Sequence, residues 1–168
     1  MNKQYKLLTC TINGKKVEKM IDVRASLTDV LRDDFRLTSV KKGCEVGECG
    51  ACNVIIDGEC FNSCIYLGVW AEGKEILTLE GLAGPNGKLS DIQQAFIDEA
   101  AVQCGFCTPG FIMSATELLN AGKEFSDDEI RKMMSGHLCR CTGYENIFRA
   151  VKKTMLRRLG KNEEADAV

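Results

Sequence analysis

Residues 44–64 read CEVGECGACNVIIDGECFNSC, and this short stretch contains five cysteines: Cys44, Cys49, Cys52, Cys60 and Cys64. A protein site that binds metal through cysteine usually has four thiolate ligands. The spacing C-x4-C-x2-C brings three thiols together over one tight loop, as a metal centre requires. Disulfide partners can lie far apart in the sequence and need no such crowding. The stretch therefore predicts a metal-binding loop with one cysteine to spare.

The whole chain has 10 cysteines among 168 residues, which is a high proportion. Its first residues show no secretory signal, so we expect a cytoplasmic protein whose cysteines bind metal rather than form disulfides. The net charge is −2 and no basic stripe carries interleaved aromatic residues, which argues against nucleic acid as a partner. The apolar stretches are too short to span a bilayer, so we expect no membrane partner. The length fits two small domains, each of which would gain stability from a bound metal.

Residues 1–82 have the pattern of a strand-rich domain. Asn13-Gly14 and Asp57-Gly58 are pairs preferred in two-residue hairpin turns, and each follows an apolar stretch. The segment SLTDVLRDDF between the two hairpins predicts a helix, with Ser26 as its N-cap. KEILTLEGL indicates a last strand, which gives the element order β-β-α-loop-β-β-β.

Residues 83–89, AGPNGKL, predict a linker, and residues 90–160 predict four helices. Three of the helix starts carry a capping box, in which Ser or Thr is followed three residues later by Glu or Gln: Ser90 with Gln93, Ser126 with Glu129, and Thr142 with Glu145. The remaining helix is expected to begin at Thr108, with Pro109 at its first position, where a missing N–H costs nothing. Residues 161–168 predict a frayed tail.

The C-x4-C-x2-C core is the spacing of plant-type [2Fe–2S] proteins, with Cys44, Cys49 and Cys52 as three ligands. The fourth ligand would be Cys60 or Cys64, which share parity along an extended strand, so strand geometry leaves both open. Cys60 lies close to the expected hairpin turn, which mildly favours Cys64. Three glycines would let the loop adopt positive φ and approach a bound core closely: Gly43, Gly47 and Gly50.

A second quartet lies in the helical half, in the pairs Cys104-x2-Cys107 and Cys139-x-Cys141. Cys107 and Cys141 are each followed by a threonine that is expected to open a helix. Two helix N-termini would then direct free N–H groups and positive dipole ends at the thiolates, which suits an anionic cluster. Taken alone, this quartet would also fit a structural zinc site, and a zinc-stapled interaction module is the alternative from a different class of function.

Four stretches together resemble one known family: KKGCEVGECGACNVIIDG, SCIYLGVWAEGKEILTLEGL, VQCGFCTPGFIMS and SGHLCRCTGYENI. The chain is similar to the iron–sulfur subunits of molybdenum hydroxylases, the xanthine dehydrogenase and aldehyde oxidase family. These stretches cover both expected domains, and the pair QCGFCTPG and LCRCTGY is highly specific. The resemblance implies an α+β fold, in which an N-terminal β-grasp plant-type ferredoxin domain precedes a C-terminal four-helix domain with its own [2Fe–2S] cluster.

The resemblance also implies roles for particular residues. Cys64 would complete the first quartet and Cys60 would be a spare thiol. Gln103 would hydrogen-bond the pterin of a molybdenum cofactor held by a partner subunit, and Cys139 would also lie near that pterin. The implied metal ligands are eight cysteines: Cys44, Cys49, Cys52, Cys64, Cys104, Cys107, Cys139 and Cys141.

The same resemblance implies electron transfer within a larger oxidoreductase. A molybdenum-cofactor subunit would oxidise the substrate, and electrons would pass through the two clusters to FAD on another subunit. The sequence offers no nucleophile with a base, no paired carboxylates and no phosphate loop, so we expect no bond-making activity of the chain itself. The stretch YLGVWAEGKEILTLEG is most similar to bacterial xanthine dehydrogenase small subunits, which favours a purine such as xanthine. Aldehydes, nicotinate-type heterocycles and carbon monoxide are the alternatives.

Other residues carry simpler predictions. His137 is the only histidine, and a Rieske-type site would need two, so we expect a surface or cap residue rather than a ligand. Cys10 is expected to be a small core residue, and Asn53 to matter little. Three aromatic residues are expected in the core or at an interface: Tyr66, Trp70 and Tyr144.

Overall fold

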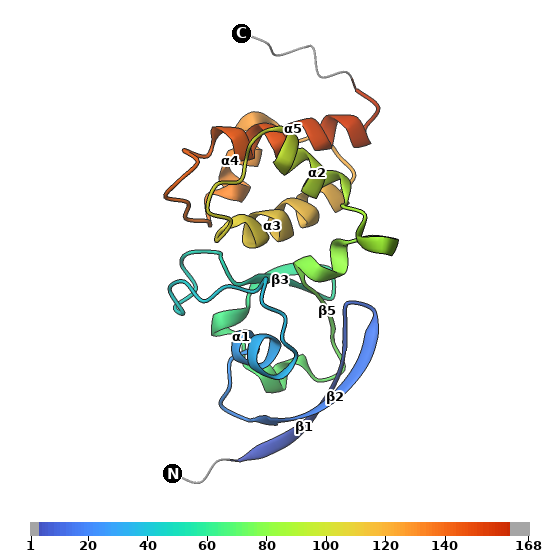
Figure 1. Ribbon diagram of the computed structural model, residues 1–168, viewed down its shortest axis with the longest axis vertical. Helices are drawn as coiled ribbons and strands as arrows, with labels where there is room; N and C mark the ends of the chain where they lie inside the picture. The colour runs from blue at the N-terminus through green and yellow to red at the C-terminus, as the bar shows by residue number, and fades with distance from the viewer. Residues whose placement is uncertain (1–3, 162–168) are drawn as a thin grey trace.

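The computed structural model describes residues 4–161, in which a mixed β-sheet with one short helix against it is followed by four helices (Figure 1). Within these residues the sheet has five strands: β1 (Tyr5–Ile12), β2 (Lys15–Asp22), β3 (Asn53–Ile56), β4 (Glu59–Asn62) and β5 (Glu75–Leu77). Their order across the sheet is β2-β1-β5-β3-β4. β1 and β5 run parallel, whereas the other neighbours are antiparallel. The predicted α+β fold, with a β-grasp sheet before a helical unit, is confirmed.

Both predicted hairpin turns are present. Asn13 and Gly14 have φ values of 50° and 75°, and Asp57 and Gly58 have φ values of 50° and 94°. Positive φ at both central residues is the type I′ geometry, whose twist matches that of the flanking strands. The two hairpins therefore form where the local sequence specifies them.

The helix across the sheet begins at the predicted cap. The Ser26 hydroxyl accepts the Asp29 N–H, and the Asp29 carboxylate accepts the Ser26 N–H, so the capping box is complete. α1 (Leu27–Asp29) continues as a π-helical turn over Val30–Asp34. Three apolar side chains of this segment are fully buried in the core of the sheet: Leu27, Val30 and Leu31. Cys10 belongs to the same core, as predicted.

The strand that follows the Asp57-Gly58 turn is short. β4 ends at Asn62, and residues 63–65 and 68–71 form 3-10 turns. The Ser63 hydroxyl donates to the Cys52 carbonyl oxygen at 2.6 Å and lies 2.6 Å from the Thr28 hydroxyl. These contacts pull the chain out of the sheet towards α1, and they join residues too far apart in the sequence to leave a local pattern.

Four helices form the second unit: α2 (Asp91–Asp98), α3 (Thr108–Asn120), α4 (Asp127–Met134) and α5 (Glu145–Arg158). Ser90 and Ser126 form the predicted capping boxes of α2 and α4. α3 begins at Thr108, as predicted, but its N-cap is Cys107, so Pro109 occupies the second helical position rather than the predicted first. All four helices contribute large, fully buried side chains to one core: Ile92, Phe96, Phe111, Leu118, Ile130 and Ile147.

The third predicted capping box does not form. α5 begins at Glu145, and its N-cap is Tyr144, which has a φ of 70° and makes no side-chain cap. Gly143 also has a φ of 70°, so two consecutive left-handed residues keep Thr142 outside the helix. The Thr142 hydroxyl instead accepts the Tyr144 N–H at 3.2 Å and lies 3.1 Å from the Cys139 sulfur. The prediction that Thr142 opens a helix is wrong.

The segment between the sheet and the helices is compact. Leu79 and Leu82, in a 3-10 turn after β5, pack against the helical core. Residues 83–89 contain a further 3-10 turn, Pro85–Gly87, and their role as a linker stays a prediction. The predicted tail, 161–168, lies outside the described residues apart from its first member. None of the helices within residues 4–161 combines the length and apolar character that crossing a bilayer requires.

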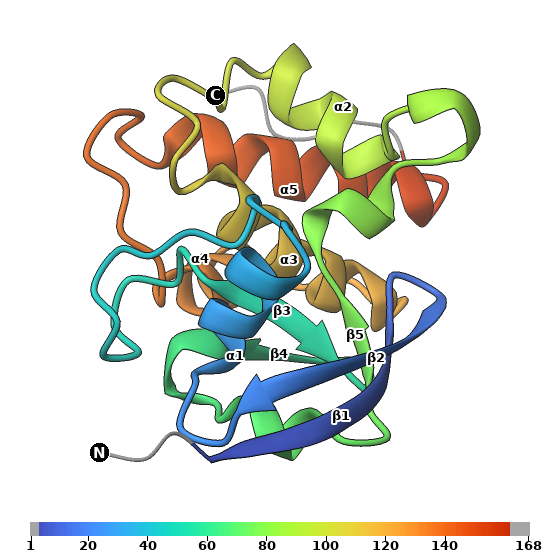
Figure 2. The same cartoon turned by 60° about the horizontal axis from the view of Figure 1, so that its bottom comes forward.

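The two units meet along α3, which packs over β3 and β4 (Figures 1 and 2). A Cβ added to Gly110 in α3 would lie under 3.0 Å from the Gly50 carbonyl oxygen. A Cβ on Gly50, whose φ is 68°, would lie 2.5 Å from a ring carbon of His137 and 2.6 Å from the Gly136 carbonyl oxygen. Backbone therefore rests directly on backbone at this contact, which requires glycine at both positions.

We expect Gly110→Ala to lower the free energy of unfolding by about 1–3 kcal/mol, because the methyl group would overlap a backbone oxygen of the first cysteine loop. Denaturant or thermal unfolding of the full chain measures the change. Gly84→Ala is the matched control, since its φ is −73° and an added Cβ would lie 3.5 Å from the nearest atom. Equal stability of the two variants would contradict the proposed role of this contact.

Candidate metal centres

The first predicted quartet is drawn together from two segments. Cys44, Cys49 and Cys52 lie on the loop that leads into β3, and Cys64 lies in the 3-10 turn after β4. The thiols of Cys44 and Cys49 are within hydrogen-bonding reach of each other, and so are those of Cys52 and Cys64. The quartet is therefore arranged as two pairs.

Backbone N–H groups surround the Cys44 sulfur. The N–H groups of Val46, Glu48 and Cys49 donate to it, with nitrogen–sulfur distances of 3.5, 3.3 and 3.4 Å. These hydrogen bonds, that of Val46 first, lower the pKa of the Cys44 thiol to about 6. The thiolate, which is the form that binds metal, is thus favoured here at neutral pH.

Glycines give this loop its close turns. A Cβ on Gly43 would lie 2.7 Å from the Cys49 sulfur, and one on Gly47 would lie 2.9 Å from the Ile65 side chain. Gly47 and Gly50 also have positive φ, at 82° and 68°. Larger residues would therefore keep the backbone away from the sulfurs, as the sequence indicated.

Cys60, the fifth cysteine of the stretch, has different neighbours. Its sulfur lies 3.4 Å from the Ser114 hydroxyl on α3, and its N–H donates to the Glu117 carboxylate at 3.0 Å. Burial raises the pKa of its thiol to about 11. Burial and the adjacent Cys52 raise the pKa of Cys64 to about 12. The choice of Cys64 over Cys60 as ligand stays a prediction, supported by the contact between Cys64 and Cys52.

The second predicted quartet lies between the start of α3 and the loop before α5. The sulfurs of Cys104 and Cys141 are 3.6 Å apart, and both residues are exposed. Cys107 is buried, and its thiol is within hydrogen-bonding reach of that of Cys139. This quartet also forms two pairs, one at the surface and one inside.

Thr142 directs two donors at the Cys139 sulfur. Its N–H lies 3.4 Å and its hydroxyl 3.1 Å from that atom. Burial opposes ionisation of Cys139, but hydrogen bonds from Thr142, Cys141 and Cys107 together hold the pKa of the thiol below its usual value. Two helix N-termini were predicted at this quartet. That of α3 is present at Cys107, but no helix begins at Thr142, which instead contacts the Cys139 sulfur through its own N–H and hydroxyl.

The pairwise arrangement of the thiols fits a two-iron core. A [2Fe–2S] cluster takes two thiolates on each iron, whereas a structural zinc site takes four ligands around one ion. The donors directed at the sulfurs would also stabilise the negative charge of a thiolate-bound cluster. The donor sets therefore fit two [2Fe–2S] clusters better than zinc.

His137 is not the surface or cap residue that the sequence suggested. Its side chain is 3% exposed and lies between the two units, with Nε2 3.1 Å from the Ser114 hydroxyl and 3.2 Å from the Asn53 amide nitrogen. Burial lowers the pKa of the imidazole. Asn53, which we expected to matter little, also donates to Ser114 at 3.0 Å. This cluster leaves no local pattern in the sequence, because Asn53 lies 61 and 84 residues from its two partners.

A backbone hydrogen bond joins the two cysteine loops. The Leu138 N–H donates to the Cys49 carbonyl oxygen at 3.1 Å. Leu138 immediately precedes Cys139, so the bond connects a predicted ligand of the first quartet with the neighbour of a predicted ligand of the second.

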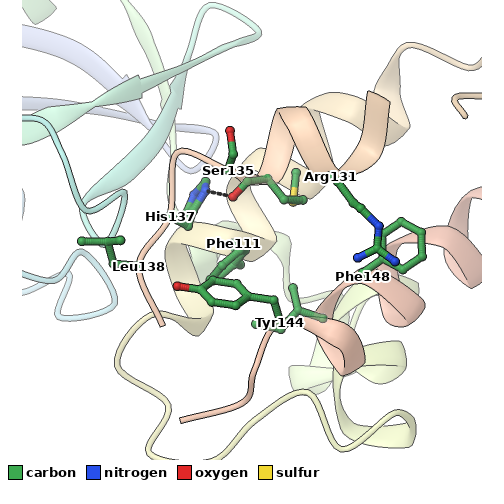
Figure 3. A pocket seen from close by; sticks show the side chains of 9 residues that line it. Phe111, Arg131, Ser135, His137, Leu138, Tyr144 and Phe148 are labelled. Atoms are coloured by element: carbon green, nitrogen blue, oxygen red, sulfur yellow. Dashed lines mark hydrogen bonds between the residues drawn. The ribbon is translucent and has the colours of Figure 1, made fainter. Parts of the chain in front are cut away.

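The surface around the second quartet is partly apolar. Gln103, predicted to contact a partner's pterin, is exposed next to Cys104. Leu138 and Tyr144 are exposed and border an apolar pocket of about 300 Å³ between α3, α4 and α5 (Figure 3). Tyr144 also accepts the Cys139 N–H through its hydroxyl at 3.0 Å. Exposed apolar groups gathered in this way are typical of an interaction surface.

Two family models match the chain. One, described as "[2Fe-2S] binding domain", matches residues 78–152, and the other, "2Fe-2S iron-sulfur cluster binding domain", matches residues 10–77. The chain thus has two [2Fe–2S]-binding domains, one in the helices and one in the sheet. The eight individual ligands stay predictions.

Known proteins match almost the whole chain. The xanthine dehydrogenase iron-sulfur-binding subunit of Escherichia coli O157:H7 is 51% identical, over 86% of this chain and 91% of that protein. The caffeine dehydrogenase subunit gamma of Pseudomonas sp. (strain CBB1) is 46% identical, over 94% of this chain and 96% of that protein. A chain of quinoline 2-oxidoreductase from Pseudomonas putida 86 superposes with a TM-score of 0.88 at 42% identity, covering 95% of this chain and 99% of that one.

We expect Cys64→Ser to remove or strongly alter one of two [2Fe–2S] signals, because the variant loses one thiolate of a quartet. Cys60→Ser is the matched control and should keep both signals, since the Cys60 thiol is buried against α3. Iron content and electron paramagnetic resonance (EPR) spectra of the reduced protein measure the outcome. Loss of a cluster in the Cys60 variant, with both retained in the Cys64 variant, would reverse the assignment.

In the cluster-free chain, iodoacetamide should alkylate Cys44 at a rate that reaches half its plateau near the pKa of about 6. The rate should rise with pH because the reactive thiolate forms as pH increases through about 6. Above that range the thiol is fully ionised, so the rate should be constant. Cys60, with a pKa of about 11, is the control and should react slowly at neutral pH. Peptide mass spectrometry measures both rates, and a Cys44 rate that rises only above about pH 8 would contradict the role of the N–H groups.

Proposed function

The chain belongs to the iron–sulfur subunits of the molybdenum hydroxylase family, and we propose that its complex oxidises a purine such as xanthine. The two relatives described above are named for xanthine and for caffeine, and both of these compounds are purines. The similarity extends over most of this chain and most of each relative, which supports assembly into a complex of the same kind. Substrate residues would lie on the molybdenum subunit, so the proposal concerns the complex as a whole.

Within such an oxidoreductase complex the chain is an electron-transfer subunit. A bound [2Fe–2S] cluster accepts one electron and passes it on. The observation that supports this role is that the eight thiols lie in four close pairs, two in each domain, and that the Leu138–Cys49 hydrogen bond joins the two cysteine regions. We assign one cluster to each quartet as its proposed resident group.

The chain's own groups also set the charge balance at each quartet. At the first, N–H groups of the loop donate to Cys44, and at the second, Thr142 donates twice to Cys139. Hydrogen bonds to sulfur stabilise negative charge and are a means of tuning a cluster's reduction potential. The cysteines hold the clusters, while these donors make the added negative charge of reduction less costly.

The proposed partners are a molybdenum-cofactor subunit and a FAD subunit. Gln103 and Cys139 are the proposed contacts on the pterin side, and the exposed position of Gln103 beside the second quartet supports this orientation. The first quartet would then face the FAD subunit. Val46 and Ile65 are exposed beside that quartet and offer an apolar surface for such a contact.

A second candidate substrate class is a nitrogen heterocycle other than a purine, as in nicotinate-type hydroxylases. The near-complete superposition on a chain of quinoline 2-oxidoreductase supports this candidate. Both candidates place the same two quartets in the same role, so they differ only in the substrate that the molybdenum subunit recognises.

The test uses the complex purified with its partner subunits under anaerobic conditions. Xanthine should bleach the visible absorption of the clusters at least about tenfold faster than quinoline, nicotinate or an aldehyde, because a pocket that hydrogen-bonds one heterocycle rejects compounds lacking the matching groups. Stopped-flow absorbance measures the rates, and dithionite gives the full bleaching for comparison. Fast bleaching by quinoline or nicotinate and none by xanthine would replace the first candidate with the second.

A further inference from the structure

A small polar cluster is buried between the two units, at the place where the cysteine loops meet. Its members come from three elements of the fold: His137 from the loop after α4, Ser114 from α3, and Asn53 from β3. His137 and Ser114 are buried and Asn53 is half-buried. None of them is a predicted ligand. Burying polar groups costs free energy unless they are hydrogen-bonded, so the cluster needs its own explanation.

His137 makes polar contacts through both ring nitrogens. Its Nδ1 lies 3.3 Å from the Met134 carbonyl oxygen, which can only accept a hydrogen bond. Its Nε2 lies 3.1 Å from the Ser114 hydroxyl and 3.2 Å from the Asn53 amide nitrogen. One imidazole thus links the end of α4 to α3 and to the strand that follows the first cysteine loop.

Phe111 and Gly50 also confine the imidazole ring. Phe111 stacks on it, with ring centroids 4.4 Å apart and an interplanar angle of 26° (Figure 3). On another side Gly50 lies so close that a Cβ there would be 2.5 Å from a ring carbon. The imidazole therefore has little freedom to shift in either direction.

The cluster lies within one residue of the contact between the loops. His137 immediately precedes Leu138, whose N–H donates to the Cys49 carbonyl oxygen at 3.1 Å. Asn53 immediately follows Cys52. The polar cluster therefore fixes the chain at Asn53, next to Cys52 of the first quartet. It also fixes the chain at His137, two residues before Cys139 of the second quartet.

We propose that His137 is a positioning residue, which through Ser114 and Asn53 holds the Leu138–Cys49 hydrogen bond and so sets the separation and electronic coupling of the two cluster sites. The proposal rests on the cluster sites of the proposed function but not on the substrate. Electron exchange between two sites falls steeply with their separation, so a loose contact between the loops would slow it. Apolar packing alone would resist such loosening less well, because it is not directional.

The first test measures amide hydrogen exchange at Leu138 in the full chain with both clusters bound. H137N introduces a shorter side chain that retains a donor for the Met134 carbonyl but lacks the ring nitrogen facing Ser114. Exchange at Leu138 should be about tenfold faster in H137N and in Ser114→Ala, which corresponds to about 1.4 kcal/mol, the order expected for one hydrogen bond. Mass spectrometry of the peptide containing Leu138 gives the rate.

Thr116→Ala is the matched control. Thr116 is a buried α3 residue like Ser114, but its hydroxyl donates to the Ile112 carbonyl within the same helix, at 2.7 Å. It should leave exchange at Leu138 unchanged. The same acceleration in the Thr116 variant would assign the effect to general loosening of α3 and overturn the proposal.

The second test is the magnetic interaction between the two clusters in the EPR spectrum of the reduced protein. H137N should lose or shrink the splitting that arises from this interaction while iron content and the two individual signals are retained. Native exchange and native splitting in both H137N and Ser114→Ala would overturn the proposal. Should H137N fail to bind both clusters, Ser114→Ala decides by the same two measurements. A complex that does not oxidise xanthine would leave these results unaffected, so the two proposals fail separately.

Discussion

The contact of backbone on backbone between Gly50 and Gly110 is the constraint on which the rest of the structure depends. Gly50 lies between Cys49 and Cys52, and Gly110 lies in the first turn of the helix whose N-cap is Cys107. With no Cβ at either position, the first cysteine loop rests directly on α3. Both quartets have members within a few residues of this contact. A larger side chain that pushed the loop away from α3 would therefore displace cysteines of both quartets.

The cysteine loops contain residues in backbone conformations that are energetically unfavourable for an isolated chain. Glu45, next to Cys44, has a φ of 57°, and Tyr144, before α5, has a φ of 70°, in a region that residues with a Cβ rarely adopt. Each such position is compensated locally. Beside Glu45, three N–H groups converge on the Cys44 sulfur, and the Tyr144 hydroxyl accepts the Cys139 N–H. The strain thus occurs where hydrogen bonds shape a sulfur site, and a bound cluster would constrain each loop further through its thiolate ligands.

Local patterns in the sequence predicted the parts of the fold that depend on residues a few positions apart. The hairpin at Asn13-Gly14 and the capping boxes at Ser90 and Ser126 form because their partners are near neighbours in the chain. Thr142 has the same capping-box pattern, but the predicted box does not form. Two left-handed residues follow Thr142, and its hydroxyl contacts the Cys139 sulfur instead. The spacing of the cysteines placed Cys44, Cys49 and Cys52 on one loop, but the thiols that meet at the second quartet come from segments more than 30 residues apart, as Cys104 and Cys141 do. Which thiols bind a cluster stays a prediction. The sheet order and the early end of β4 arise from contacts between distant segments, which leave no pattern of spacing.

His137 shows most clearly what a sequence conceals. A lone polar residue is expected at the surface because burial strips it of water, and only convergent partners reverse that expectation. Here the partners come from α3, β3 and the end of α4, so burial is favourable only where these three segments meet. An apolar residue could fill the same space, but it would tolerate sliding of one loop over the other. Directional bonds at the contact define one arrangement, and in a protein that carries electrons between two centres the spacing of those centres is the property that most needs defining.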